Sequence, residues 1–206
     1  MHRVSVDTAL ILAGGAASRF GGSKALQDVA GKPMIRRVVD AMTPLAGEVL
    51  VSVADETAVD AMRSALPGVT FVLDRRAGIG PVEGLRRGAE VAHGDRLLVA
   101  PCDAPLLRTD LFALLGRALG NHQAAVPKLD VFDPIRAVYR TSAVRGILAK
   151  QDGGPPSPSA VVDRLDAVFV EAEQLRSVDP HLDSFFDVNT SGDLDEVVRR
   201  LREPGS

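Results

Sequence analysis

The sequence LILAGGAASRFGGSKAL, residues 10–26, joins an apolar run to a polar loop that carries a pair of glycines on each side of Arg19. Glycine lets backbone N–H groups approach an anion without an intervening Cβ, and Arg19 and Lys24 add full positive charges to those partial ones. The stretch therefore predicts a buried strand followed by a phosphate-binding loop.

The spacing of these glycines does not match two common nucleotide motifs. Five residues separate Gly15 from Gly21 and no Gly-Lys-Ser/Thr follows, so the loop is not a P-loop. No Gly-x-Gly-x-x-Gly occurs either, which argues against a nicotinamide-dependent oxidoreductase. If the loop binds a nucleotide, it must belong to a class other than these two.

The rest of the chain alternates short apolar runs with helical periodicity, which predicts a doubly wound sheet with right-handed crossovers. Ligands bind at the carboxyl ends of the strands in such sheets. We therefore expect an α/β fold: a three-layer, Rossmann-like, mostly parallel sheet. The expected strands are 8–12, 49–53, 69–73, 97–100, 124–127, 135–139 and 167–170, and the expected helices are 33–42, 57–66, 82–92, 111–119, 141–150 and 191–201.

One cluster of helix and strand breakers, residues 153–158, could be a domain linker or a surface loop. We favour the loop, because the fifty residues that follow are too few to build an independent core. The strand expected at 167–170 should then complete the same sheet. The interpretation is one domain over residues 1–206.

Composition limits the partners. The net charge of -3 provides no positive field to hold nucleic acid, and the aromatic content of 4% argues against base-stacking surfaces. Cys102 is the single cysteine, as in proteins of a reducing compartment, and no apolar run is long enough to cross a membrane. We expect a soluble, cytoplasmic protein, a monomer or small homo-oligomer, that acts on small molecules.

Four motifs then carry a resemblance. Residues 12–26 resemble the signature of the nucleoside-triphosphate transferases, most closely the molybdenum cofactor guanylyltransferases. Three later segments resemble that family's later motifs, in the same order. They are Asp74 with Gly-Pro-Val-Glu-Gly-Leu at 80–85, Pro-Cys-Asp-Ala-Pro at 101–105, and Asp-Val-Asn-Thr at 187–190. The resemblance implies the nucleotide-diphospho-sugar transferase type of fold, with a nucleotide-binding half at about 8–120 and an acceptor-binding half at about 121–202.

The resemblance also implies roles for the nucleotide-binding half. The glycine loop should wrap the nucleotide, with Arg19 and Lys24 on its phosphates, and Asp74 should lie beside the base, where a carboxylate favours guanine. The implied nucleotide-binding residues are Leu12, Ala13, Gly14, Gly15, Arg19, Gly22, Lys24, Asp74, Gly80, Pro81 and Gly84.

Metal and acceptor residues follow from the same resemblance. Asp103 should bind Mg²⁺ and, with Arg19 and Lys24, form the catalytic set; Asn189 should lie near the metal and the acceptor phosphate. Asp187 and Arg136 are the other residues implied to bind the acceptor. The residues alone also allow purely structural roles. Asp103 could lie in a turn, Asp74 in a loop, and Asp187 and Asn189 could cap the last helix.

The implied reaction is Mg²⁺-dependent transfer of GMP from GTP to the phosphate of molybdopterin, releasing pyrophosphate. Ser23 stands where many members have Asp, and Val53-Ala54 where many have Asn, so other bases and acceptors stay open. The alternatives are cytidylyl transfer to the same cofactor, guanylyl transfer to phospholactate or a corrinoid phosphate, and a non-catalytic nucleotide-binding regulator.

Overall fold

The fold is built on a seven-stranded sheet in the order β5-β4-β1-β6-β8-β7-β9. A computed structural model describes residues 7–14, 24–76, 78–149 and 157–202. Only β8 runs antiparallel to its neighbours. The strands are β1 (Thr8–Leu12), β4 (Glu48–Val53), β5 (Thr70–Leu73), β6 (Arg96–Pro101), β7 (Ala124–Lys128), β8 (Ala137–Arg140) and β9 (Ala167–Glu171). The predicted α/β class with a mostly parallel sheet is confirmed.

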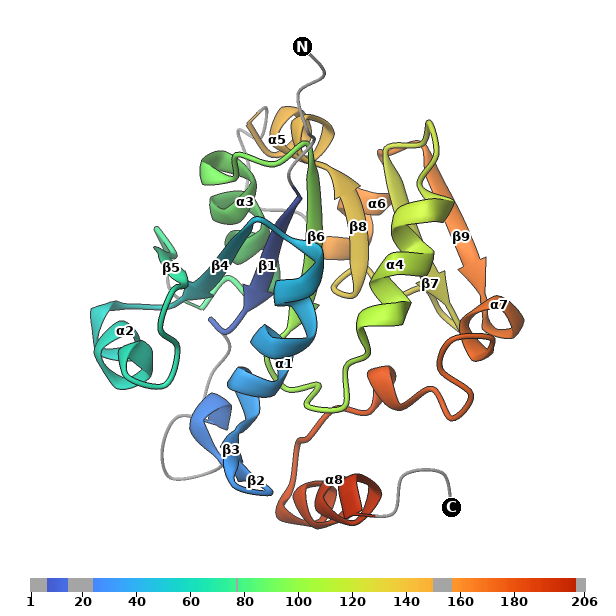
Figure 1. The fold of residues 1–206 in the computed structure, drawn as a ribbon. Helices are drawn as coiled ribbons and strands as arrows, with labels where there is room; N and C mark the ends of the chain where they lie inside the picture. The colour runs from blue at the N-terminus through green and yellow to red at the C-terminus, as the bar shows by residue number, and fades with distance from the viewer. Residues whose placement is uncertain (1–6, 15–23, 77, 150–156, 203–206) are drawn as a thin grey trace.

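Helices cover both faces of the sheet and make three layers (Figure 1). Buried side chains of α1, α2, α4 and α7 join one core cluster, and those of α3, α5 and α6 join the other. The helices are α1 (Met34–Met42), α2 (Glu56–Arg63), α3 (Pro81–Val91), α4 (Thr109–Ala118), α5 (Thr141–Ala149), α6 (Pro158–Val162), α7 (Ala172–Arg176) and α8 (Ser191–Arg202). None of these helices is long and apolar enough to cross a membrane.

Strand β1 lies between β4 and β6, and all five of its residues are buried. Because side chains alternate along a strand, Ile11 packs into the α1 side of the core and Leu10 into the α3 side. A run of apolar residues without polar alternation is what a strand covered on both faces requires. The opening sequence thus forms the centre of the sheet.

The segment after the breaker cluster extends the same sheet, because β9 pairs in parallel with β7. Residues 150–156 lie outside the described part of the chain, so only Ser157 and Pro158 of the cluster are seen, at the start of α6. The strand predicted at 167–170 is therefore confirmed.

A small hairpin, three 3₁₀ turns and the short helices α6 and α7 were not predicted. Strands β2 (Asp28–Val29) and β3 (Lys32–Pro33) are joined by Ala30 and Gly31 at φ 50° and 81°, the left-handed pair of a tight hairpin turn. The last helix α8 packs on this hairpin through Val29 and Val197. The 3₁₀ turns are η1 (Lys24–Leu26), η2 (Thr43–Leu45) and η3 (Asp183–Phe185).

Candidate active site

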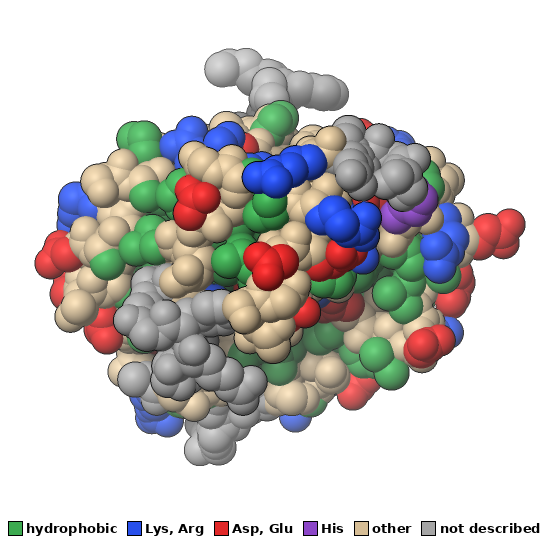
Figure 2. Space-filling model, turned by 90° about the horizontal axis from the view of Figure 1, so that it is seen from below, with side chains coloured by type: hydrophobic (Ala, Val, Ile, Leu, Met, Phe, Trp, Pro, Cys, Tyr) green, Lys and Arg blue, Asp and Glu red, His purple; other side chains and the backbone are tan. Residues whose placement is uncertain are grey.

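The predicted site residues follow the carboxyl ends of three strands at one edge of the sheet. Gly14 follows β1, Asp74 follows β5 and Asp103 follows β6. Backbone bonds continue the ladder past the strand ends, from Asp74 N to Val53 O at 2.9 Å and from Cys102 N to Leu12 O at 3.1 Å. Figure 2 views this lower side of the molecule, where acidic and basic side chains lie among apolar ones.

Lys24 joins two predicted metal-side residues that are distant in sequence. Its Nζ donates to Asp103 Oδ2 at 2.8 Å and to Asn189 Oδ1 at 3.0 Å. The Lys24 and Asp103 side chains are 20% and 25% exposed, so both keep access to a ligand. The three residues form what we call the lysine cluster: one ammonium group that donates to two acceptor oxygens.

The segment before α8 is fixed beside Asp103 by its backbone, since Val188 N donates to Asp103 O at 2.9 Å. Thr190 and Asp193 cap α8 reciprocally: Asp193 N donates to Thr190 Oγ1, and Thr190 N donates to Asp193 Oδ2 at 2.7 Å. These reciprocal bonds make a capping box at the start of the helix. The side chain of Asn189 takes no part in that box and is turned to Lys24 instead.

Arg136 lies in the interior and does not face the site as a free cation. It is 3% exposed, and its guanidinium pairs with Asp133 and Asp187 and donates from Nε to Ser184 O at 2.8 Å. Burial raises the pKa of Asp187; the Arg136 charge opposes that rise and the Asp103 carboxylate adds to it. In this geometry Arg136 holds Asp187 near Asp103.

Asp74 forms a second corner of the site with Ser52 and Gly14. Ser52 Oγ donates to Asp74 Oδ1 at 2.8 Å. A Cβ on Gly14 would lie 2.5 Å from Asp74 Oδ2, so any larger residue at this position would displace the carboxylate. Burial raises the pKa of Asp74, and the Glu83 carboxylate raises it further, against the Ser52 hydrogen bond.

The start of α3 closes this corner. Gly80 has φ 90°, which side chains other than that of glycine rarely adopt, and Pro81 opens the helix. A Cβ on Gly84 would lie 2.5 Å from Ser52 Oγ and 2.9 Å from Leu12 Cδ2. The predicted Gly-Pro-x-x-Gly motif thus lets a helix pack tightly against the ends of β1 and β4.

Sequence reasoning missed Ser52 and Glu83. Glu83 is 1% exposed; its Oε1 accepts from Arg75 N at 3.2 Å, while Oε2 is buried without a hydrogen bond, 3.6 Å from Arg86 Nε. This carboxylate holds the turn that follows Asp74. The sequence signal that could have identified Glu83 is its position in the first turn of α3, where acidic residues are favoured. No such signal exists for Ser52, which is a serine inside a mostly apolar strand.

The oxygen donors of the lysine cluster suit Mg²⁺. This hard cation takes one or two carboxylates and keeps waters or phosphate oxygens in its other positions, and Asp103 with Asn189 Oδ1 offers such a partial set. Within the described ranges there is no group of three or more His, Cys, Asp or Glu side chains that could hold a metal ion. Burial raises the pKa of the adjacent Cys102 to about 12, so this thiol is not a nucleophile at neutral pH.

Three predicted residues of the glycine loop, Gly15, Arg19 and Gly22, lie outside the described residues. Leu12, Ala13 and Gly14 end the visible strand segment before that loop, and Lys24 begins the chain after it. Of the residues that flank the loop, Gly14 therefore lies beside Asp74 and Lys24 lies in the lysine cluster.

Comparisons with known proteins identify the family of this chain. Residues 9–176 match the model of a family described as the MobA-like NTP transferase domain. The chain is similar to the molybdenum cofactor guanylyltransferases of Desulfosudis oleivorans (30% identity; 95% of this chain and 96% of that protein) and Burkholderia ambifaria (31%; 94% and 96%).

A solved structure is similar over nearly the whole chain. It is the molybdopterin-guanine dinucleotide biosynthesis protein A of Archaeoglobus fulgidus, with a TM-score of 0.80 at 25% identity, covering 95% of this chain and 99% of that one.

Proposed function

The chain belongs to the family of MobA-like NTP transferase domains, and from this premise we propose that it transfers GMP from GTP to the phosphate of molybdopterin and releases pyrophosphate. The observation that carries the proposal is the lysine cluster, which brings a cation and two oxygen ligands together beside the carboxyl end of β6. We further propose that it acts in the cytoplasm, as a monomer or small homo-oligomer.

The reaction requires charge neutralisation and alignment. An oxygen of the acceptor phosphate attacks the α-phosphorus of GTP in line; the bond from that phosphorus to the bridging oxygen breaks, and pyrophosphate leaves with the electron pair. Lys24, with Arg19 of the glycine loop, offsets the negative charge that builds up on the leaving group. An anionic nucleophile needs no general base, and none of the described residues is assigned that role.

Asp103 and Asn189 are the residues that would hold Mg²⁺, which when bound supplies positive charge to the phosphate oxygens. Lys24 keeps both side chains oriented toward the same point before substrate arrives. Asp187, held by Arg136, faces this region from the acceptor-binding half and orients the acceptor.

The nucleotide preference can be tested directly. Pyrophosphate release should be measured with GTP, CTP and ATP, each with purified molybdopterin cofactor as acceptor, and then with phospholactate or a corrinoid phosphate in its place. We expect turnover with GTP and the molybdenum cofactor. Equal rates with all three nucleotides would overturn the guanine assignment, and activity with another acceptor alone would overturn the molybdopterin assignment.

We expect Asp74→Asn to lower kcat/KM for GTP about 10- to 100-fold and to leave the value for ATP nearly unchanged. An ionised carboxylate accepts from both N1–H and the amino group of guanine, and hydrogen bonds to charged groups contribute about 1.5–3 kcal/mol. Adenine has no N1–H to donate. The measurement is steady-state kinetics with both nucleotides, with Asp60→Asn on the exposed side of α2 as the control.

The raised pKa of Asp74 adds a pH test. The carboxylate must be ionised to accept both bonds, so the KM for GTP should rise as the pH falls through this pKa, which lies above the ordinary 3.8. Because the folded state holds the proton more tightly than the unfolded state, ionisation of Asp74 costs stability. Relative to Asp74→Asn, the wild type should therefore gain stability toward acid, and a KM independent of pH would contradict the assignment.

A further inference from the structure

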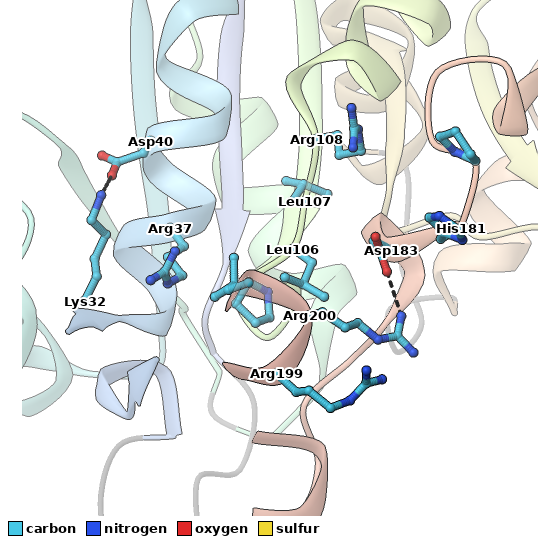
Figure 3. A pocket seen from close by; sticks show the side chains of 13 residues that line it. Lys32, Arg37, Asp40, Leu106, Leu107, Arg108, His181, Asp183, Arg199 and Arg200 are labelled. Atoms are coloured by element: carbon cyan, nitrogen blue, oxygen red, sulfur yellow. Dashed lines mark hydrogen bonds and ion pairs between the residues drawn. The ribbon is translucent and has the colours of Figure 1, made fainter. Parts of the chain in front are cut away.

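A groove outside the candidate active site lies between α1, the loop after β6, the segment before η3, and α8 (Figure 3). Its volume is about 850 Å³, and none of the described residues assigned to the nucleotide, metal or acceptor lines it. Its floor is apolar: Leu106 and Leu107 lie in the middle of the view, with Arg37 on one side and Arg108 and Arg200 on the other.

The groove is lined by more cations than carboxylates, although the net charge of the chain is -3. Five Lys or Arg side chains line it, against two carboxylates. Three of these cations are paired: Lys32 with Asp40 at 2.6 Å, Arg200 with Asp183 at 2.6 Å, and Arg199 with Glu196, which does not line the groove, at 2.7 Å.

Arg37 and Arg108 differ from these paired cations. Arg37 donates from Nε and Nη2 to the carbonyl oxygen of Val29, at 2.8 and 2.6 Å, so its partners there are neutral. Arg108 is exposed, and its side chain makes no hydrogen bond or ion pair with any described residue. No carboxylate in the described ranges lies within ion-pair distance of either guanidinium, so both positive charges remain uncompensated.

The arrangement of these charges indicates the shape of the ligand. The cations are distributed along both sides of the leucine floor and do not converge on one point, as Figure 3 shows. A single phosphate group needs donors that converge on it. An extended chain that places an apolar side chain on Leu106 and Leu107, with carboxylates on both sides, matches the floor and the charges together.

We propose that this groove binds an acidic segment of a partner protein, in which an apolar side chain is flanked by Asp or Glu. The complementarity of charge argues for such a segment over a neutral one, because it raises the rate of association and excludes basic competitors. The site is separate from the proposed catalytic residues, so a partner could dock while the transfer reaction proceeds.

The proposal can be tested by selecting random decapeptides displayed on phage against the full-length protein. We expect the selected peptides to be enriched in Asp and Glu around a Leu, Ile or Phe. Synthetic copies should bind the double variant Arg37→Gln/Arg108→Glu about tenfold more weakly than the wild type, since each exposed charge contributes modestly. Their association rate should also fall as salt is raised from about 50 to 200 mM.

Arg63→Glu is the matched control, because this charge reversal lies on α2 outside the groove, where the side chain is 68% exposed. The control should bind like the wild type, and all variants should keep pyrophosphate release. Selected peptides that lack acidic residues, or that bind the double variant as tightly as the wild type, would overturn the proposal. So would displacement of the peptides by micromolar tripolyphosphate, which would identify a small-anion site.

Discussion

Asp103→Asn is expected to lower the turnover number for pyrophosphate release about 10³-fold while GTP still binds. The substitution keeps the size of the side chain but removes the negative charge that faces Lys24 at 2.8 Å, and an amide oxygen is a weaker ligand for a hard cation. Loss of one preorganised electrostatic group at a transition state typically costs 10²- to 10³-fold, and loss of a metal ligand more. The concentration of Mg²⁺ needed for half-maximal activity should also rise.

The control for this experiment is Asp110→Asn, on the exposed first turn of α4. It should leave turnover and the Mg²⁺ requirement unchanged. Asp103 is a quarter exposed, so its variant should fold, and unchanged melting temperatures would verify this. If Asp103→Asn keeps full function, the protein is better explained as a nucleotide-binding regulator than as a transferase.

Arg136→Met is expected to lower the free energy of unfolding by about 3 kcal/mol. The buried guanidinium neutralises two carboxylates and donates to a buried backbone oxygen, so its removal leaves Asp133 and Asp187 facing each other without a cation. Breaking a buried ion pair costs about 3–5 kcal/mol. The lower end applies because the two aspartates keep 22% and 35% of their side-chain surface exposed to water.

The free energy of unfolding of the variant and the wild type should be measured by urea denaturation, with the same m-value for both. Arg164→Met, at an exposed position after α6, is the control and should change stability by less than about 0.5 kcal/mol. Arg136→Lys should be intermediate, because it keeps the charge but loses the planar fork. A loss below about 1 kcal/mol for Arg136→Met would mean that this pair does not hold the acceptor-binding half together.

The strand and helix pattern was predictable because its signals are local. The apolar residues of β1 and the helical spacing of Met34, Ile35 and Val38 each lie within one element, and the elements that were predicted match the structure within a few residues. The short helices α6 and α7 were missed, because five residues are too few to show a clear helical period. The helix expected from Thr57 to Leu66 instead starts at Glu56, after the Asp55 cap, and ends at Arg63. The predicted helix end at Lys150 lies outside the described residues.

Other features needed the whole fold. The direction of β8 was not predicted, although the short connection from β7 leaves no room for the helical crossover that a parallel neighbour requires. The roles of Ser52 and Glu83 depend on β4, the turn after β5, and α3 meeting at one corner. No pattern within any one of these segments reveals that meeting.

The sequence by itself determined most of the strands and the loops after them that carry Gly14, Asp74 and Asp103, because a buried apolar run and its flanking loop are recognisable over a few residues. Only the tertiary structure decides which charges meet: Lys24 faces Asp103 and Asn189, whereas Arg136 turns inward to Asp133 and Asp187. The sequence does not distinguish an arginine that binds a phosphate from one that neutralises buried carboxylates. The partners of the arginine come from distant segments that only folding brings within a few ångströms.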